Sequence, residues 1–481
     1  MIPRRLGPRS AKPRTAKAGC AVVFLGLFLL AQPGCHTTSP PPNIILITID
    51  TLRADHLSVY GDTTIHTPNI GRLAAEGILF ENAFTNVTWT VPSLATVMTG
   101  EYPYEHGVRR WDDRLGTKVT LAATLRQHGY HTAAIVASAA LDRVFGLDQG
   151  FEYYDDSIKT QDQLNRDTGQ TSAGHILSQP EPPPLGSYLF DDKLADKAIA
   201  WIDHHPKGPF FLWVHFLGPH EKPERDNTGP NPTERAKAAY APDVEFMDRQ
   251  VGRFLQRIRE DPIASQTAIL FHSDHGQSLM EHGLMGHGQD LYDTTAHVPL
   301  IIRLPGKRDA GQRVNRVVAN VDLFPTVLSL AGVPPPGTHG HDLLATDGKD
   351  ETVYMETFLT ADFPQDTTYE GKKLSFVYSL RGLRTRNWKL IETDPFPAPQ
   401  PDGRDGPPLP VAFVDSHRAV ALISMKEDPE ERKSVATVFP KKTDEMLARL
   451  STYASGDASG SHVDLDGATR ERLRALGYLK R

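Results

Sequence analysis

The chain has 481 residues, of which 39% are hydrophobic and 23% charged, as is ordinary for a folded globular protein. Its formal net charge of −7 gives no reason to expect a nucleic acid as a partner. Both cysteines, Cys20 and Cys35, lie near the start of the chain. The remainder therefore contains no disulfide and offers no cysteine as a nucleophile or metal ligand. The length allows one large domain with an appendage, or two domains.

The first 35 residues are predicted to be an export leader. Six basic and no acidic residues precede an apolar run over 18–31. That run is short for a membrane span and of the right length for a signal peptide. Gly34-Cys35 resembles the cleavage and lipidation point of a bacterial lipoprotein, and an uncleaved N-terminal anchor is the alternative. We therefore expect an exported protein of the bacterial cell envelope (periplasm or outer surface), held to the membrane by an N-terminal lipid anchor, with 36–42 as a linker.

Apolar runs rich in β-branched residues then alternate with helical patterns. The runs predicted as buried strands are 43–50, 131–138, 210–216, 267–274 and 298–304. Helical spacing of apolar residues occurs over 68–76, 191–202 and 246–258. Loops are predicted over 157–187, 221–238 and 394–410. The alternation predicts an α/β fold over 43–345, with a large, mainly parallel sheet sandwiched by helices. A smaller α+β subdomain with an antiparallel sheet and a final helix near 468–476 is predicted over 346–481.

Two aspartates end predicted strands: Asp50 closes the first, and Asp274 closes a later one and precedes His275. A carboxylate at the end of a buried strand is costly unless something compensates it, and a metal ion does so well. Helix capping is the alternative for either aspartate alone. Because ligands bind at the carboxyl ends of parallel strands, His215 and His220, in and after another strand, belong to the same edge. The pattern predicts a metal site there.

Thr90 precedes a short apolar helix predicted up to about residue 98, with Pro92 in its first turn. Free backbone N–H groups at that position favour an anion. A hydroxyl beside a metal would be a workable nucleophile there. The alternative is that Thr90 is only a helix N-cap.

Several segments, in their order along the chain, resemble the sulfatase family of the alkaline phosphatase superfamily. They are PNIILITIDTLRADHLSVYG (42–61), TPNIGRLAAEGILFENAF (67–84), TVPSLATVMTG (90–100), HGVR (106–109), PFFLWVHFLGPH (209–220), HSDHGQSLMEHG (272–283), GHGQDLYDTTAHVPLIIRLPG (286–306) and RERLRALGYL (470–479). The similarity runs from about residue 42 to the end of the chain. It implies a large α/β domain, a smaller C-terminal domain, and a metal-bound nucleophile that attacks a sulfate or phosphate ester.

The resemblance assigns roles to individual residues. Asp50 and Asp274 match metal-binding aspartates of the family, and His275 falls where sulfatases have Asn or His. Thr90 falls on the residue that sulfatases oxidise to formylglycine. His220 matches a substrate-facing histidine.

Two further histidines lie in the matched segments. His287 falls where many sulfatases have a substrate-binding lysine, and His215 is a possible substrate contact. We expect His220 or His287 to contact the departing group. Together with His215 they could instead hold a second metal.

The sequence also departs from the family. Thr51 replaces a metal-binding aspartate, and Leu94 replaces the arginine of the family signature. Ala137 and Ala139 stand where the family supplies a lysine and a histidine to sulfate. Threonine cannot become the formylglycine aldehyde, so no formylglycine is expected and Thr90 would act as a plain hydroxyl. The resulting ligand set favours Zn²⁺ or Mn²⁺ over Ca²⁺ or Mg²⁺.

We therefore predict a sulfatase-family, metal-dependent hydrolase or group transferase of sulfate or phosphate esters, with phosphate or phosphonate esters favoured. The expected metal ligands are Asp50, Asp274, His275 and Thr90. The expected substrate is a small-molecule, glycan or lipid-headgroup ester. The alternatives are a true sulfuric ester hydrolase that uses unmodified Thr90, and a non-catalytic binding lipoprotein of the cell envelope.

Overall fold

A computed structural model describes ten ranges of the chain. They are residues 40–157, 188–220, 231–345, 350–362, 368–369, 372–373, 375–394, 412–415, 418–453 and 461–462. The leader over 1–35, most of the loop over 157–187 and the helix predicted near 468–476 lie outside these ranges. No helix within these ranges has the length and apolar character needed to cross a membrane.

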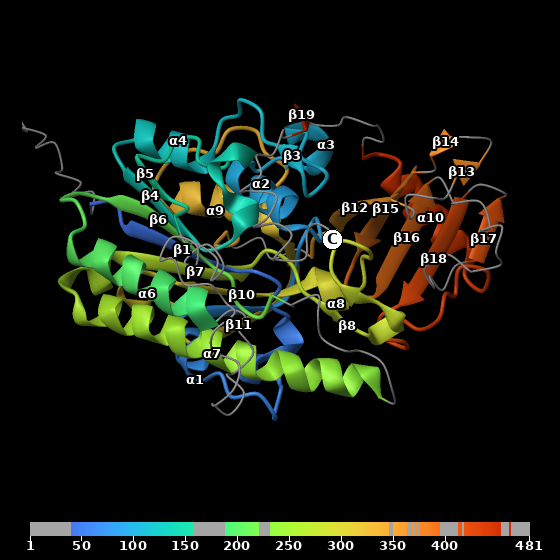
Figure 1. Ribbon diagram of the computed structural model, residues 1–481, viewed down its shortest axis with the longest axis horizontal. Helices are drawn as coiled ribbons and strands as arrows, with labels where there is room; N and C mark the ends of the chain where they lie inside the picture. Colours follow the sequence, from blue (N-terminus) through green and yellow to red (C-terminus); the bar gives the residue numbers. More distant parts are fainter. Residues whose placement is uncertain are drawn as a thin grey trace, which may run out of the picture. The chain divides into compact units, whose positions relative to one another are not determined.

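The core of residues 41–481 is an eight-stranded sheet in the order β11-β2-β10-β7-β1-β6-β4-β5 (Figure 1). Its strands are β1 (Asn43–Ile49), β2 (Ile78–Phe84), β4 (His131–Val136), β5 (Tyr153–Asp155), β6 (Phe210–Phe216), β7 (Thr267–Ser273), β10 (His297–Arg303) and β11 (Gln312–Ala319). Every residue of β1, β6 and β7 is buried. These strands are apolar on both faces because helices cover both sides.

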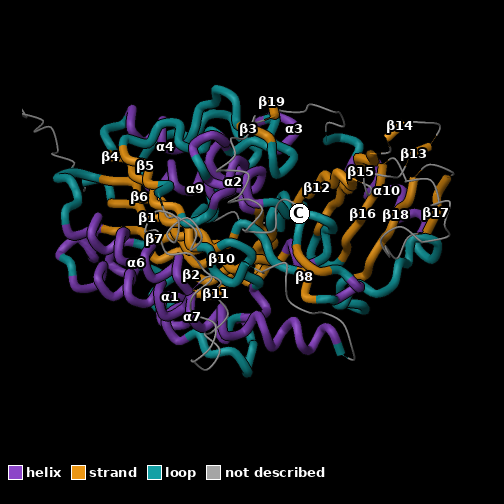
Figure 2. The backbone as a smooth tube through the Cα atoms, viewed as in Figure 1, coloured by secondary structure: helices purple, strands orange, loops and turns teal. Residues whose placement is uncertain are grey.

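Helices pack on both faces of this sheet (Figure 2). One face is covered by α2 (Thr90–Thr99), α4 (Leu121–Gln127) and α9 (Leu323–Leu330), and the other by α1 (Pro68–Ala75), α6 (Tyr188–Asp203) and α7 (Pro232–Glu260). The predicted α/β sandwich is confirmed, as is the mainly parallel character of its sheet. The sheet is nevertheless mixed, because β10 runs antiparallel to both β2 and β7.

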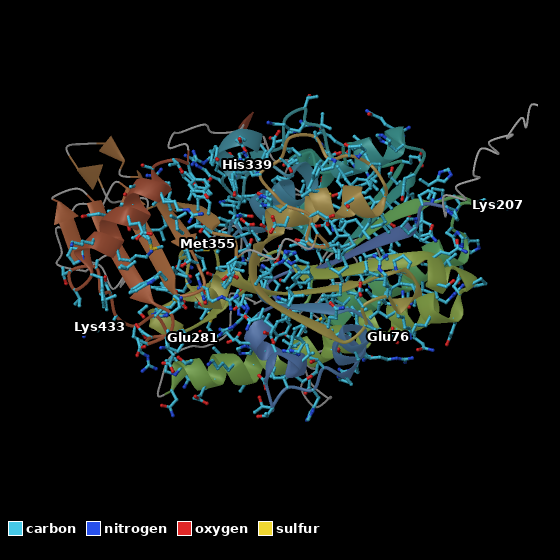
Figure 3. The ribbon with its side chains drawn as sticks, turned by 180° about the vertical axis from the view of Figure 1, so that it is seen from behind. Glu76, Lys207, Glu281, His339, Met355 and Lys433 are labelled. Carbon is cyan, nitrogen blue, oxygen red and sulfur yellow. The ribbon has the colours of Figure 1, made fainter. Side chains whose placement is uncertain are left out.

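A second, antiparallel sheet follows in the order β12-β15-β16-β18-β17. Its elements are β12 (Val353–Asp362), β15 (Ser375–Arg384), β16 (Trp388–Asp394), β17 (Ala412–Asp415), β18 (Arg418–Ser424) and the helix α10 (Pro440–Leu450). Met355 of β12, labelled in Figure 3, lies in a third hydrophobic core that this sheet shares with Phe84 and Tyr292. The predicted C-terminal antiparallel sheet is therefore present, and the boundary between residues 345 and 346 stays a prediction.

One predicted loop is partly wrong. Residues 232–238, expected to belong to a loop over 221–238, form the first turns of α7. This helix runs from Pro232 to Glu260 and contains Pro242. Its proline-punctuated, charged start suggested a loop, but proline is well suited to the first turn of a helix.

Candidate metal and nucleophile site

Asp50 and Asp274 each follow the last residue of a strand in the middle of the sheet. Because β7, β1 and β6 are neighbouring parallel strands, their carboxyl ends meet at one edge. The backbone N–H of Asp50 donates to Phe216 O at 3.0 Å, and that of Asp274 donates to Ile49 O at 3.3 Å. The sheet hydrogen bonds thus continue past the strands and fix both aspartates side by side.

Asp50, Asp274 and His275 bring one ligand atom each to within 4.8 Å of one another. His275 Nε2 lies 3.9 Å from Asp50 Oδ1 and 3.6 Å from Asp274 Oδ2. All three side chains are fully buried. Three of the four residues that the sequence predicted as metal ligands therefore converge.

The rest of the chain compensates these carboxylates only in part, because Asp274 Oδ1 alone accepts hydrogen bonds, from the N–H groups of Thr51 and His275. Neither oxygen of Asp50, nor Oδ2 of Asp274, has a hydrogen-bond partner among the described residues. Burial raises the pKa of Asp274 well above its usual range, and the nearby charge of Asp50 raises it further. Buried carboxylates without partners are costly. Carboxylate and imidazole donors gathered in this way fit a divalent cation.

Thr90 is the first residue of α2, and Trp89 is the N-cap with extended φ and ψ of −125° and 141°. The interpretation of Thr90 as an N-cap is therefore wrong, and so is its placement just before the helix. Its Oγ1 lies 3.2 Å from His275 Nε2. Ser93, one turn further along α2, donates to Asp274 O at 2.7 Å and ties the helix to the end of β7.

The hydrogen bonds of His275 fix its tautomer. Nδ1 lies 3.0 Å from the carbonyl oxygen of Gly276, which can only accept, so Nδ1 carries the proton. Nε2 therefore presents its lone pair to Thr90 and to the two carboxylates. Burial lowers the pKa of His275 to about 4, so the ring stays neutral near pH 7.

His220 and His287 lie together beside this corner. Their Nε2 atoms are 3.4 Å apart, and the ring of His287 stacks on that of His275 with 4.4 Å between centroids. Burial lowers the pKa of His287 well below its usual value, and the neighbouring His275 and His220 add to the shift. The structure thus places the two predicted catalytic histidines next to His275, and their roles stay predictions.

His215 lies deeper. It is fully buried, its Nδ1 is 2.8 Å from Thr48 Oγ1, and its Nε2 is 3.8 Å from Asp50 Oδ2. It belongs to the same corner as the metal-ligand candidates, and its predicted contact with substrate stays a prediction.

At the positions where the sequence departs from the family, three side chains are buried and apolar, and the fourth residue, Thr51, contacts Asp274 through its backbone. Leu94, Ala137 and Ala139 are buried in the hydrophobic cores on the two faces of the sheet. Thr51 has a positive φ of 58° and donates its backbone N–H to Asp274 Oδ1 at 3.2 Å. Apolar packing takes the place of the arginine, the lysine and the histidine that the family has at the first three positions.

The sequence did not single out Trp89 or the strand that supports it. Trp89 Nε1 donates to Phe358 O at 3.2 Å, and Thr357 Oγ1 donates to Gly288 O at 2.8 Å. Both partners come from β12, so the second sheet supports the turn before Thr90 and the loop that carries His287. An aromatic residue immediately before a proposed nucleophile was the available signal.

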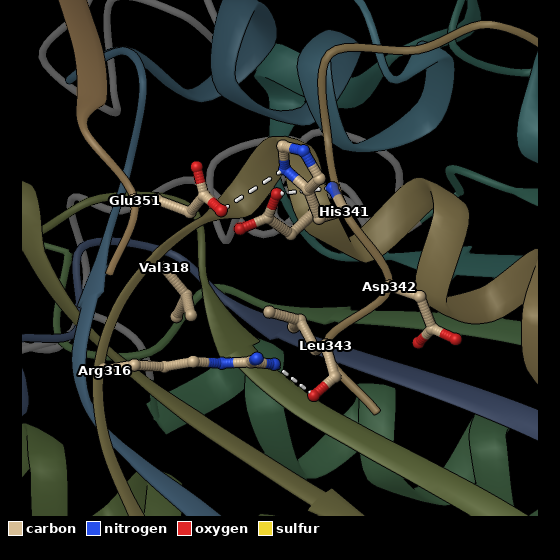
Figure 4. Close-up of a pocket in the computed structure, with 7 residues that line it drawn as sticks. Arg316, Val318, His341, Asp342, Leu343 and Glu351 are labelled. Atoms are coloured by element: carbon tan, nitrogen blue, oxygen red, sulfur yellow. Dashed lines mark hydrogen bonds and ion pairs between the residues drawn. The ribbon is translucent and has the colours of Figure 1, made fainter. Parts of the chain in front are cut away.

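A separate small pocket lies at the end of β11 (Figure 4). It is lined by residues that include Arg316, His341 and Glu351, and it shares no residue with the Asp50 corner. The site described above is therefore a buried corner at the sheet edge rather than this pocket.

An α/β sandwich with two aspartates and a histidine at the strand ends, facing a hydroxyl at a helix start, defines a class of metal-dependent hydrolases. The sulfatase family model matches residues 42–333, and the C-terminal model of N-sulphoglucosamine sulphohydrolase matches residues 280–394. The chain belongs to the sulfatase family and is a hydrolase of ester bonds. Enzymes with the sulfatase fold depend on a metal ion for activity. Asp50, Asp274 and His275 form a group that could hold a metal ion in this chain.

Known relatives agree with this assignment. An arylsulfatase of Clostridium perfringens is 26% identical over 368 residues, which cover 61% of this chain and 76% of the relative. Human iduronate 2-sulfatase is 25% identical over 468 residues, covering 75% of this chain and 82% of the relative.

Solved structures share the fold. A 2-O GAG sulfatase superimposes with a TM-score of 0.65 at 21% identity, covering 86% of this chain and 92% of that chain. The phosphonate monoester hydrolase of Agrobacterium radiobacter has a TM-score of 0.63 at 22% identity, covering 85% of this chain and 95% of that chain. The predicted fold class is confirmed.

Proposed function

We propose that this hydrolase cleaves phosphate or phosphonate esters through the unmodified hydroxyl of Thr90, with a Zn²⁺ or Mn²⁺ ion held by Asp50, Asp274 and His275. The observation that supports the proposal most directly is the 3.2 Å contact between Thr90 Oγ1 and the Nε2 lone pair of His275. It places a hydroxyl beside the three donor groups and at the start of a ten-residue helix.

The chain's own residues prepare the attack. The N-terminus of α2 favours negative charge at Thr90 and at an ester's oxygens. A bound divalent cation would supply Lewis-acid stabilisation of the ionised hydroxyl and of charge developing on the ester. In the proposed reaction the Thr90 hydroxyl gives its proton to solvent, its oxygen bonds to phosphorus, and the bond from phosphorus to the departing oxygen breaks.

His220 and His287 would serve the departing group. Their Nε2 atoms lie 3.4 Å apart and the ring of His287 stacks on that of His275, which supports a role for one of them beside Thr90. One of them would give a proton to the departing oxygen. Water would then displace the Thr90 oxygen and release the phosphate or phosphonate, which restores the hydroxyl.

The preference for phosphorus over sulfur rests on chemistry at four positions. Thr90 cannot form the aldehyde used by sulfatases. Leu94 replaces the arginine of the family signature, Ala137 and Ala139 stand where the family supplies a lysine and a histidine to sulfate, and all three are buried apolar residues. Similarity to a phosphonate monoester hydrolase is consistent with the proposal.

Sulfate esters are the second possibility, because the family and the arylsulfatase relative are named for them. In that case unmodified Thr90 would attack sulfur. Membership of a family of ester hydrolases argues against the third interpretation, which is a non-catalytic binding lipoprotein. Export and lipid anchoring stay predictions.

The test compares three aryl esters on one purified protein: a sulfate, a phosphate monoester and a phosphate diester. Metal content is measured on the same sample, and the mass of the peptide with Thr90 shows whether it is modified. We expect the phosphorus esters to be turned over faster. Dominant turnover of the sulfate would overturn the preference.

Variants at Thr90 complete the test. Thr90→Val keeps the shape and removes the hydroxyl, so it should lower turnover by several orders of magnitude. Thr90→Ser is the matched control that keeps a hydroxyl, and it should retain much of the activity. Equal activity in Thr90→Val and the wild type would rule out Thr90 as the nucleophile.

A further inference from the structure

A row of polar side chains crosses the centre of the sheet directly beneath Asp50. Thr48 of β1 pairs in register with His215 of β6 on one side and with His272 of β7 on the other. In-register residues of parallel strands project to the same face, and residue 50 shares that face with residue 48 because side chains alternate. All three are fully buried. Their hydrogen bonds must therefore be satisfied within the protein.

The direction of the hydrogen bonds in this row is set by Trp213. Its Nε1–H can only donate, and it donates to Thr48 Oγ1 at 2.9 Å. Thr48 Oγ1 lies 2.8 Å from His215 Nδ1. This nitrogen is the one acceptor that the described residues offer to the hydroxyl proton of Thr48. A protonated Nδ1 would leave that proton buried without an acceptor, which is costly.

The neutral ring of His215 therefore accepts at Nδ1 and carries its proton on Nε2. Nε2 lies 3.8 Å from Asp50 Oδ2, too long for a hydrogen bond but close enough for its N–H dipole to attract the carboxylate. The other oxygen, Oδ1, lies on the side of His275, at 3.9 Å from its Nε2. The two oxygens of Asp50 thus face different partners.

We infer that His215 is a positioning residue, oriented by Trp213 and Thr48, which holds Asp50 so that one oxygen remains directed to the cation. It is not itself a ligand, because the ligand atoms that converge within 4.8 Å among the described residues come from Asp50, Asp274 and His275. Groups that orient a metal-binding carboxylate control the affinity for the metal. The inference rests on the proposed function only in that Asp50 binds the cation.

The first experiment measures the affinity of the purified protein for Co²⁺ by visible absorption in competition with a chelator. His215→Leu removes the N–H donor and should weaken binding roughly 10- to 100-fold. His215→Gln keeps an amide N–H and should restore most of the affinity. Thr48→Val, which is nearly isosteric, should weaken binding by a smaller factor because the ring is no longer held in one tautomer.

His272→Leu is the matched control. It removes another fully buried histidine from the same row, one whose Nδ1 faces Pro299 O at 3.2 Å. Its Co²⁺ affinity should equal that of the wild type, and circular dichroism checks that each variant folds. Should Thr48→Val and His215→Gln fold while His215→Leu does not, those two variants still decide the outcome.

Several results would overturn the inference. Unchanged Co²⁺ affinity in His215→Leu, with a raised KM for the ester, would make His215 a substrate contact instead. Absence of Co²⁺ binding by the wild type would also refute it. If the wild type binds Co²⁺ and the variants change this affinity as expected, but the wild type turns over no phosphorus ester, the inference about His215 stands and the proposed function is refuted.

Discussion

Thr90 Oγ1 lies 3.2 Å from His275 Nε2, although 185 residues separate them in the chain. Thr90 is held by the start of α2 and His275 by the end of β7. Because Ser93 of α2 also donates to Asp274 O, the helix and the strand are fixed to one another next to this contact. The hydroxyl and the imidazole are therefore arranged before any substrate arrives, as preorganised catalysis requires.

Metal removal should destabilise the wild type and not Asp274→Asn. A cation at 1,000 times its dissociation constant would add about 4 kcal/mol to the free energy of unfolding. Asp274→Asn lowers metal affinity, and because burial and the charge of Asp50 already favour the neutral form of Asp274, this variant without metal should be at least as stable as the wild type. Thermal unfolding with and without a chelator checks both points. The exposed Asp309→Asn serves as control and should behave as the wild type. A wild-type melting temperature unaffected by chelator would contradict the metal site.

Above about pH 6.5, where histidine is uncharged in both the folded and the unfolded protein, the metal-free protein should lose stability as the pH rises to about 8. Burial raises the pKa of Asp191 to about 8 and of Asp322 to about 6. These carboxyls bind protons more tightly in the folded protein than in the unfolded chain, so the stabilisation they give is complete at low pH. It is lost as the pH passes their folded pKa values.

Asp191→Asn tests this dependence. Its carboxylate accepts the N–H groups of Leu217 and Gly218 at 2.9 and 3.1 Å, just before His220. An amide does not ionise, so the urea midpoint of this variant should fall less between pH 6.5 and pH 8. The surface variant Asp309→Asn should keep the wild-type slope. A wild-type midpoint that rises over this interval would show that other groups dominate.

The buried ammonium of Lys389 should be essential to the junction between the two sheets. It lies 2.5 Å from Asp293 Oδ1 and 2.5 Å from Glu431 Oε1, and it donates to Leu291 O at 2.9 Å. Lys389→Met leaves Glu431 without a cation and Asp293 with Arg384 alone, and it should cost about 3–5 kcal/mol of unfolding free energy in urea titrations. Lys426→Met removes an exposed lysine whose nearest carboxylate is 3.9 Å away, and it should change little. Equal midpoints for the two variants would refute the prediction.

Gly288→Ala should disturb the loop that carries His287. A Cβ at Gly288 would lie 2.0 Å from Cε2 of Trp89, and its φ is +77°. Trp89 would have to move, and with it the turn before Thr90, so we expect lower kcat and lower thermal stability. Gly332→Ala, with a φ of +70° and open space around the new Cβ, carries the strain without the clash. If both variants lose the same stability and neither loses activity, the contact with Trp89 is unimportant.

Much of the site could be predicted because its signals are local. An apolar run that ends in a carboxylate marks a strand end, and this pattern placed both Asp50 and Asp274 correctly. Alternation of strands and helices predicted a parallel arrangement, which brings such ends to one edge. The nature of Thr90, with its extra methyl group, is likewise written in the sequence and excludes the aldehyde.

Other features depend on pairings between distant segments. The antiparallel β10, the support of Trp89 by β12 and the path from Trp213 through Thr48 to His215 follow from strand order and register. The hydrophobic patterns that predict strands and helices extend over only two to four positions, so they do not indicate which strands become neighbours in the sheet. The sequence by itself therefore determined which chemical groups are available and that two of them end buried strands. Only the tertiary structure decided which nitrogen faces which oxygen, because that depends on backbone hydrogen bonds between segments far apart in the chain.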